Sequence, residues 1–198
     1  MTDTTTGTLG RRERKKAATR QALADAALRL FLERGYDQVS VREIADAADV
    51  STTTLFAHFP GKEALVFDQD SEIEDALVAA VRDRAPGQSI PAALRDRLLE
   101  HEGPSEADPA QAAFLQLVRS TPALDEYSRR MWLRHEQALA HAIAEAVGAP
   151  EDDLPSAALA RFALQSRNLA DGPDGRRAGI ECAFELLEHG WHATHGDR

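Results

Sequence analysis

The chain of 198 residues contains a single cysteine, Cys182, and this shortage excludes two kinds of site. One thiol cannot build a disulfide framework within the chain or a zinc site made of several cysteines. Because Cys182 lies among apolar residues, we expect it to be a small buried hydrophobic residue. No apolar run approaches the ~20 residues that cross a bilayer, and the amino terminus lacks the apolar segment of a secretory signal. We therefore expect a cytoplasmic protein with no membrane partner.

Signatures of catalysis are also missing from the sequence. A di-metal carboxylate bundle needs Glu-x-x-His pairs, and the chain contains none. No Ser-His-Asp or Cys-His constellation can be anchored, and Asp171–Gly175 is a turn rather than a phosphate-binding loop. We expect no enzyme activity, no metal and no cofactor, with an all-helical enzyme as the least favoured alternative.

The net charge of −10 conceals an uneven distribution of charge along the chain. Residues 1–60 contain nine basic and eight acidic side chains, whereas residues 61–198 contain 14 and 25. Residues 11–20, RRERKKAATR, hold six basic residues and one acid. Such a basic segment can meet phosphate while an acidic body stays away from it, although a solvated tail explains the same run.

Apolar residues recur at helical spacing through most of the chain, with Pro and Gly separating the segments. No convincing strand pattern and no internal repeat occur, so we expect an all-α protein. The pattern predicts about nine helices, near residues 12–34, 41–48, 52–59, 62–85, 90–102, 108–119, 123–147, 153–170 and 174–194.

Residues 41–59 form a candidate helix-turn-helix, two short helices joined by a turn at residues 48–51. Ser40 and Glu43 fit a capping box, and a second N-cap falls on Ser51. Leu55 and Phe59 lie four positions apart on one face and should pack into a core. The rest of this helix is then available to an outer face: Thr52, Thr53, Thr54, Phe56 and His58.

The run of threonines at the front of this helix indicates outward use. Threonine is a mediocre helix former, so the run gives up local stability. Its hydroxyl groups can bond phosphates or base edges, its methyl groups can contact a thymine methyl, and the helix amino terminus favours phosphate. The pattern predicts a helix that reads a DNA groove, with Lys62 near a neighbouring phosphate. A plain three-helix bundle with solvated threonines is the alternative.

Three motifs stand at fixed spacing: LFLERGY at 30–36, VREIA at 41–45 and VSxxTLFxHFPxKExL at 50–65. In these motifs the chain resembles the DNA-binding domain of the TetR family of bacterial repressors over about residues 14–67. Two positions depart from the family pattern. Phe56 stands where the family commonly has tyrosine, and Asp49 where the turn commonly holds glycine. Aspartate tolerates the left-handed conformation better than most residues, so we expect the turn to form.

The resemblance implies a role for each matching position. Thr52 and Thr53 would read bases, and Arg42 would contact a phosphate or a base. Arg11 and Arg12 would extend into a minor groove. Further DNA contacts would fall on Ser40, Thr54, Phe56, His58 and Lys62, with Phe56 offering only apolar contact.

The same resemblance implies the domain organisation. We expect a disordered tail at 1–10, a helix-turn-helix DNA-binding domain at 11–60 and a larger helical ligand-binding and dimerisation domain at 61–198. One small helix reads few bases, so a homodimer should place two heads about 34–36 Å apart on a near-palindromic operator. The expected function is a ligand-responsive dimeric repressor released by a small, mostly apolar molecule. A DNA-binding dimer without a small-molecule effector is the alternative.

Aromatic and Met side chains with a few polar groups suit a mostly apolar ligand. The candidate cavity walls are Phe67, Leu98, Phe114, Leu117, Tyr127, Met131, Trp132, His135 and Phe162. By resemblance, the last two helices pair with their copies in the dimer, and their apolar stripes give the candidate interface: Leu154, Ala158, Ile180, Phe184, Leu187 and Trp191. Core packing within one chain is the alternative for both sets.

Overall fold

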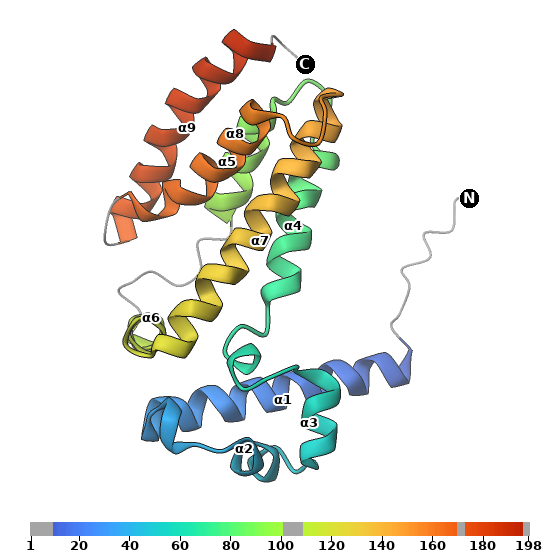
Figure 1. The fold of residues 1–198 in the computed structure, drawn as a ribbon, viewed down its shortest axis with the longest axis vertical. Coiled ribbons are helices and arrows are strands. Elements are labelled where there is room, and N and C mark those ends of the chain that lie inside the picture. Colours follow the sequence, from blue (N-terminus) through green and yellow to red (C-terminus); the bar gives the residue numbers. More distant parts are fainter. Residues whose placement is uncertain (1–9, 101–108, 170–172, 196–198) are drawn as a thin grey trace, which may run out of the picture. The chain divides into compact units, whose positions relative to one another are not determined.

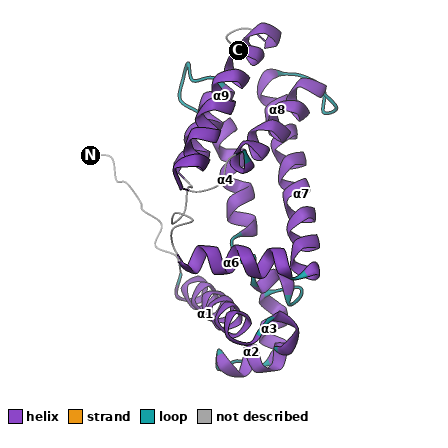
Figure 2. Ribbon diagram, turned by 90° about the vertical axis from the view of Figure 1, so that its left-hand side faces the viewer, coloured by secondary structure: helices purple, strands orange, loops and turns teal. Residues whose placement is uncertain are grey.

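The computed structural model describes residues 10–100, 109–169 and 173–195, which form two compact units (Figure 1). The first unit consists of the described residues up to Asp68 together with Leu117–Leu124, and the second consists of the remainder. All regular structure in the described part of the chain is helical, with nine α-helices (Figure 2), which confirms the predicted all-α class. The predicted tail lies outside the described residues except for Gly10, and the first unit runs past the boundary expected at residue 60.

The first unit is built on the long helix α1 (Arg11–Arg34), which packs against α2, and α2 packs against α3. Gly35, with φ of 85°, ends α1, and its N–H donates to the carbonyl of Phe31 at 2.9 Å. The other elements are η1 (Tyr36–Gln38), α2 (Val41–Ala47), α3 (Thr52–His58) and η2 (Glu63–Leu65). The side chains of this unit that are exposed by 1% or less include Leu23, Ala27, Phe31, Ile44, Leu55 and Phe59. Burial of each large side chain contributes roughly 1.5–3 kcal/mol.

The second unit is a helical bundle in which α5 packs against α4, α8 and α9 (Figure 1). Its elements are α4 (Asp70–Arg82), α5 (Ile90–Glu100), most of α6 (Pro109–Ser120) and α7 (Pro122–Val147), α8 (Leu154–Gln165), η3 (Ser166–Asn168) and α9 (Pro173–His195). The core of this bundle includes a set of apolar side chains that are inaccessible to solvent: Val81, Ile90, Leu94, Leu139, Ile143, Ala160 and Ile180.

Three sequence predictions about these elements are wrong. The helix expected from residue 62 is instead η2, followed by α4 starting at Asp70. The carbonyl of Asp68 accepts a hydrogen bond from Arg20 at 2.7 Å, so it is occupied by a side chain before α4 begins. The eighth helix ends at Gln165 rather than near 170. Cys182 is exposed rather than buried, because it lies on the outer face of α9.

None of the helices in the described residues combines the length and the apolar character that crossing a membrane requires.

The capping box of α2 generates a pH prediction. The Glu43 carboxylate accepts hydrogen bonds from the backbone N–H and the hydroxyl of Ser40, both at 2.8 Å, and from Arg34 at 2.8 Å. These hydrogen bonds lower the pKa of Glu43 to about 2, and the two bonds from Ser40 contribute more than the bond from Arg34. A lowered folded-state pKa stabilises the folded state above the ordinary glutamate pKa, and that stabilisation is lost as pH falls towards about 2.

We therefore expect Glu43→Gln to be less stable than wild type at neutral pH, with a difference that shrinks on acidification from about pH 5. Denaturant unfolding followed by circular dichroism at a series of pH values measures this. Glu33→Gln is the matched control, because Glu33 makes only an exposed ion pair with Arg29 at 3.7 Å. Parallel pH curves for wild type and Glu43→Gln would contradict the prediction.

Candidate functional site

Helix α3 has one buried face and one face open to solvent. Leu55 and Phe59 are exposed by 0% and 1%, so they anchor the helix in the core of the first unit, as the sequence predicts. The outer face of α3 consists of the other residues that the sequence predicts to face outward. Thr53 and Phe56 are exposed, and Thr52, Thr54 and His58 are partly buried. None of the three threonines packs fully inward, so the helix presents hydroxyl groups at its amino end.

The turn between α2 and α3 has the backbone that the sequence predicts. Asp49 has φ of 53°, the one positive φ of a non-glycine residue in the described residues. The N–H of Val50 then donates back to the carbonyl of Ala45 at 3.0 Å and closes the turn. Asp49 thus adopts the left-handed conformation at the position where the resembling family commonly has glycine.

The hydroxyl groups around the start of α3 differ in their hydrogen bonding. The Ser51 hydroxyl accepts a hydrogen bond from the N–H of Thr54 at 3.1 Å and lies 2.9 Å from the Thr54 hydroxyl. Ser51 and Thr54 therefore cap the helix between them. Thr53 is exposed, and within the described residues its hydroxyl makes no hydrogen bond, so it is free to meet a ligand.

The charged candidates outside α3 are exposed. The Arg42 side chain is 84% exposed and makes only a loose ion pair with Asp46 at 3.9 Å. Arg11 and Arg12 are exposed in the first turn of α1, so they belong to a helix rather than to an extended arm. Ser40 is exposed, but its hydroxyl already caps α2.

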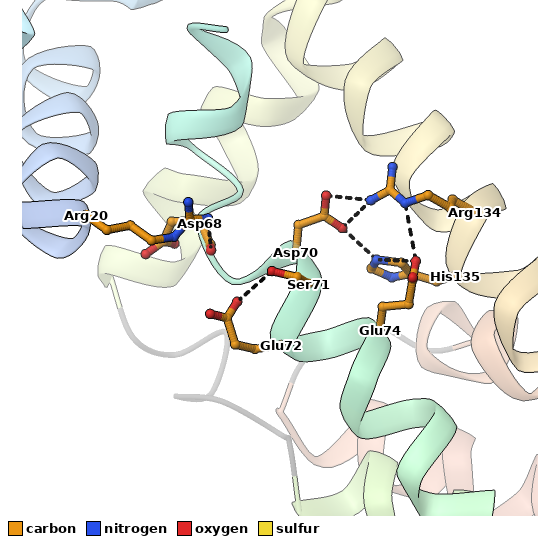
Figure 3. Close-up of polar contacts among 8 residues, drawn as sticks. All are labelled: Arg20, Asp68, Asp70, Ser71, Glu72, Glu74, Arg134 and His135. Carbon is orange, nitrogen blue, oxygen red and sulfur yellow. Dashed lines mark hydrogen bonds and ion pairs between the residues drawn. The ribbon is translucent and has the colours of Figure 1, made fainter. Parts of the chain in front are cut away.

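Arg20, to which no motif in the sequence points, contacts the carboxyl-terminal end of α3. Its guanidinium donates to the carbonyls of His58 at 2.9 Å and Asp68 at 2.7 Å (Figure 3), and lies 4.3 Å from the centre of the Phe59 ring. Burial, and then the positive charges of Lys16 and Arg20, lower the pKa of His58. The His58 imidazole is therefore protonated less readily than an ordinary histidine side chain, which favours hydrogen bonding over charge in its contacts with a ligand near neutral pH.

Lys62 has a role inside the first unit. Its ammonium donates to the carbonyl of Tyr36 and lies 3.9 Å from the centre of the Tyr36 ring and 5.3 Å from that of Phe31. Burial lowers the pKa of Lys62. The phosphate contact predicted for Lys62 therefore competes with an existing set of contacts.

A polar cluster holds the start of α4 in the second unit (Figure 3). The Asp70 carboxylate accepts hydrogen bonds from Arg134 at 2.5 and 2.6 Å, and the Nε2 of His135 lies 2.7 Å from it. Arg134 also reaches Glu74, one turn further along α4, at 3.3 Å. His135 is fully buried, and its Nδ1 has no hydrogen-bond partner in the described residues. We name this set, Asp70, Glu74, Arg134 and His135, the α4 clamp.

The second unit also contains a small pocket, partly open to solvent, with a cavity volume of about 50 Å³. We name it the inner pocket. Its lining comes from five elements: Ile73, Leu77, Arg97, Leu98, Trp132, Arg167, Arg176 and Ile180. A more open recess between α7 and α8 shares Trp132 and Arg167 with it. The guanidinium carbon of Arg167 lies 4.2 Å from the centre of the Trp132 ring, so this pair stands between the two spaces.

The predicted cavity walls are placed unevenly. Leu98 and Trp132 line the inner pocket. Phe67 and Leu117 belong to the first unit, and Phe162 is 55% exposed on α8, a position that does not suit a cavity wall within one chain. The other candidates belong to the second unit but do not line the pocket: Phe114, Tyr127, Met131 and His135. The three pocket arginines come from distant segments, and nothing in their sequence neighbourhood identifies them.

The predicted interface residues divide in a similar way. Ile180 and Phe184 are exposed by only 0% and 1%. They therefore belong to the core where α9 meets α5 and α8, instead of to the interface that the sequence predicts. Leu187 packs partly against that core. Leu154 is 80% exposed and Ala158 is partly buried on α8, while the side chain of Trp191 lies outside the described residues. Leu186, not predicted, is 72% exposed on α9.

Comparison with known proteins identifies the class to which this two-unit, helix-turn-helix chain belongs. The family model described as "Bacterial regulatory proteins, tetR family" matches residues 23–68. TcmR of Streptomyces glaucescens, an HTH-type transcriptional regulator, is 36% identical over 73% of this chain and 67% of that protein. The HTH-type transcriptional repressor Rv1474c of Mycobacterium tuberculosis is 30% identical over 87% of this chain and 92% of that protein. The chain belongs to the TetR family of transcriptional regulators.

Solved structures share the fold over nearly the whole chain. A TetR-family regulator from Streptomyces coelicolor A3 has a TM-score of 0.57 and 24% identity, covering 91% of this chain and 97% of its own. NalD of Pseudomonas aeruginosa, the secondary repressor of a multidrug efflux pump, has a TM-score of 0.54 and 19% identity, covering 89% and 97%. SmeT in complex with triclosan has a TM-score of 0.54 and 16% identity, covering 87% and 91%. Because TcmR and Rv1474c place the chain in a family of transcriptional regulators, the expectation that it is not an enzyme is confirmed.

The contacts of Lys62 generate a stability prediction. Lys62→Met removes a charge-assisted hydrogen bond to the Tyr36 carbonyl, and we expect it to lower the free energy of unfolding by about 1–2 kcal/mol. Urea denaturation of the full chain measures the change. Lys16→Met, at an exposed position of α1, should stay within about 0.5 kcal/mol of wild type. Equal effects of the two changes would show that the Tyr36 contact adds nothing.

Proposed function

We propose that this chain is a ligand-responsive dimeric repressor that reads DNA with the outer face of α3. The observation that carries the proposal is the division of α3 between a buried face, Leu55 and Phe59, and an exposed threonine at its front. Thr53 has a free hydroxyl and methyl for base edges. Arg42 supplies an exposed cation for a phosphate or a base, and Thr52, Thr54 and His58 complete the contact surface.

Phe56 adds an apolar group to this surface, and its exposure of 53% argues for use by a partner. A phenylalanine ring cannot donate to phosphate, so we propose that it packs against sugars or a thymine methyl. We also propose that Ser40 contacts DNA and that Arg11 and Arg12 reach into a minor groove. Lys62 is proposed to contact the sugar-phosphate backbone of the DNA.

A second copy of the chain is proposed to pack on α8 and α9. Leu154, Ala158 and Phe162 follow one another at intervals of four residues along α8, so they share one face of the helix. Leu154 and Phe162 are exposed on it by 80% and 55%, and α9 adds Leu186 at 72%. Family members bind DNA as dimers, and two α3 helices about 34–36 Å apart would read a near-palindromic operator.

The inner pocket is the feature that favours an effector over a dimer without one. Ile73 and Leu77 bring α4 into its lining, and the first residue of α4, Asp70, is held by the α4 clamp. We propose that a small molecule with a mostly apolar body shifts the population of α4 positions and lowers DNA affinity. A coupling of a few kcal/mol is enough for such a response. The proposed location is the cytoplasm, where the operator of a bacterial regulator lies.

Selection of bound duplexes from a random pool tests the DNA proposal. We expect Thr53→Ala to lose preference at one base position in each half-site, at a cost of about 1–3 kcal/mol for the cognate base. Arg42→Ala should weaken binding to most sequences and reduce the slope of log affinity against log salt by about one unit. Arg42 serves this purpose better than Lys62, whose ammonium is already engaged inside the first unit.

Two controls sharpen this experiment. Thr53→Ser keeps the hydroxyl and loses the methyl, so it separates hydrogen bonding from apolar contact. Arg29→Ala removes an equally charged but unassigned side chain from α1 and should leave the salt slope unchanged. If neither Thr53→Ala nor Arg42→Ala alters binding, the outer face of α3 does not read DNA.

The dimer proposal predicts the effect of a charge on the exposed face of α9. Leu186→Glu should raise the dimer dissociation constant by about tenfold or more, because a buried carboxylate would face apolar side chains. Analytical ultracentrifugation across a concentration series measures this constant. Leu32→Glu places the same charge on α1, where the leucine is 43% exposed, and should leave it unchanged. A monomeric wild-type chain at micromolar concentration would refute this interface.

A further inference from the structure

The inner pocket gathers three arginines within an acidic part of the chain. Its lining combines apolar side chains from α4, α5 and α9 with Trp132 and three arginines, Arg97, Arg167 and Arg176. Among the lining residues that the structure describes, none is an aspartate or a glutamate. Residues 61–198 contain 14 basic residues against 25 acidic ones. Three of these 14 basic residues line this single pocket.

Arg167 is the pocket arginine that lacks an anionic partner within the described residues. Its guanidinium stacks on the Trp132 ring, yet within the described part of the chain no carboxylate or carbonyl forms an ion pair or hydrogen bond with it. Burial, and then the positive charge of Arg176, lower the pKa of Arg167 to about 10. A desolvated cation beside a like charge is unfavourable until an anion joins it.

We propose that the inner pocket binds a small organic carboxylate, whose charged group pairs with Arg167 and whose apolar body packs against Trp132 and the aliphatic walls. This inference rests on the proposed function, because it specifies the chemical class of the effector. The planar guanidinium matches a carboxylate through two parallel hydrogen bonds. Four aliphatic side chains, Ile73, Leu77, Leu98 and Ile180, leave the rest of the molecule a hydrocarbon surface.

Free phosphate shares the negative charge but suits this lining less well. Its remaining oxygens would face hydrocarbon and lose their hydration without new hydrogen bonds. A neutral molecule of the same shape would fill the apolar part but leave Arg167 without an anion. The lining therefore favours a molecule with one charged end and an apolar body.

Occupation of the pocket bears directly on α4. Ile73 and Leu77 lie one and two turns into this helix, whose first residue belongs to the α4 clamp. A carboxylate drawn towards Arg167 brings its apolar body against these two side chains. Binding energy at the pocket can therefore bias the position of α4, which any coupling to DNA affinity requires.

Calorimetry on the full chain tests the anion site with acids and their neutral amides. The probes are benzoate, 2-naphthoate and hexanoate, each paired with the corresponding amide, and inorganic phosphate as a separate arm. We expect at least one acid to bind about tenfold or more tightly than its amide. Arg167→Gln should abolish this preference. Arg177→Gln should retain it, because the neighbouring Arg177 is exposed and pairs with Glu181 at 3.6 Å.

Thermal unfolding gives a second readout that guards against a misfolded variant. Without added acid, Arg167→Gln should unfold at a midpoint no lower than wild type, because it removes an unpaired cation. The tightest acid should raise the midpoint of wild type and of Arg177→Gln but not that of Arg167→Gln. Arg167→Lys keeps the charge without the planar fork and should bind the acid with intermediate affinity.

Several outcomes would overturn the inference. Equal affinity for every acid and its amide, or acid binding that survives Arg167→Gln, would show that the arginines form no anion site. Phosphate binding as tight as the best acid would refute the requirement for an apolar body. Fluorescence anisotropy on the selected duplex then measures DNA affinity with and without that acid. If the acid binds at Arg167 and DNA affinity does not change, its role as effector is wrong.

The two proposals fail in different ways. A chain that binds no DNA in the selection refutes the DNA proposal, whereas calorimetry on the same chain still decides whether the pocket takes a carboxylate.

Discussion

The guanidinium of Arg20 fixes the end of α3, and the presentation of the outer face of α3 depends on it. It binds the carbonyl at the end of α3 and the carbonyl of Asp68, and it stacks on Phe59. Helix α3 has only seven residues, too few to be stable alone. Its orientation must therefore come from Arg20 and from the burial of Leu55 and Phe59. The threonines lie on the outer face because the opposite face of α3, with Leu55 and Phe59, is buried in the core of the first unit.

Local signals in the sequence were enough to place the helix-turn-helix. The bonds of the Ser40–Glu43 capping box and of the Ser51 cap join residues three positions apart, so spacing alone reveals them. The positive φ of Asp49 is also a local property of a tight turn. For the same reason the ends of α1 and α3 agree with the predicted helices to within a residue or two.

Long-range contacts decided what the sequence could not. The hydrogen bond from Arg20 to Asp68 joins residues 48 positions apart, so residues near 62 do not reveal where α4 begins. Arg20 was missed although it stands three residues before the buried Leu23, on a face where a charge needs a partner. An apolar stripe shows that a face is buried but not what covers it, so Ile180 and Phe184 fitted an interface and a core equally well. The pocket arginines share no local pattern.

The stacked pair of Trp132 and Arg167 forms a wall that two spaces share. Because the pair lines both the inner pocket and the wider recess between α7 and α8, a movement that separates the ring from the guanidinium changes the walls of both spaces at once. An occupant of the recess that displaced Arg167 would therefore alter the surface against which an occupant of the inner pocket packs. The two spaces would then respond to each other through this one contact.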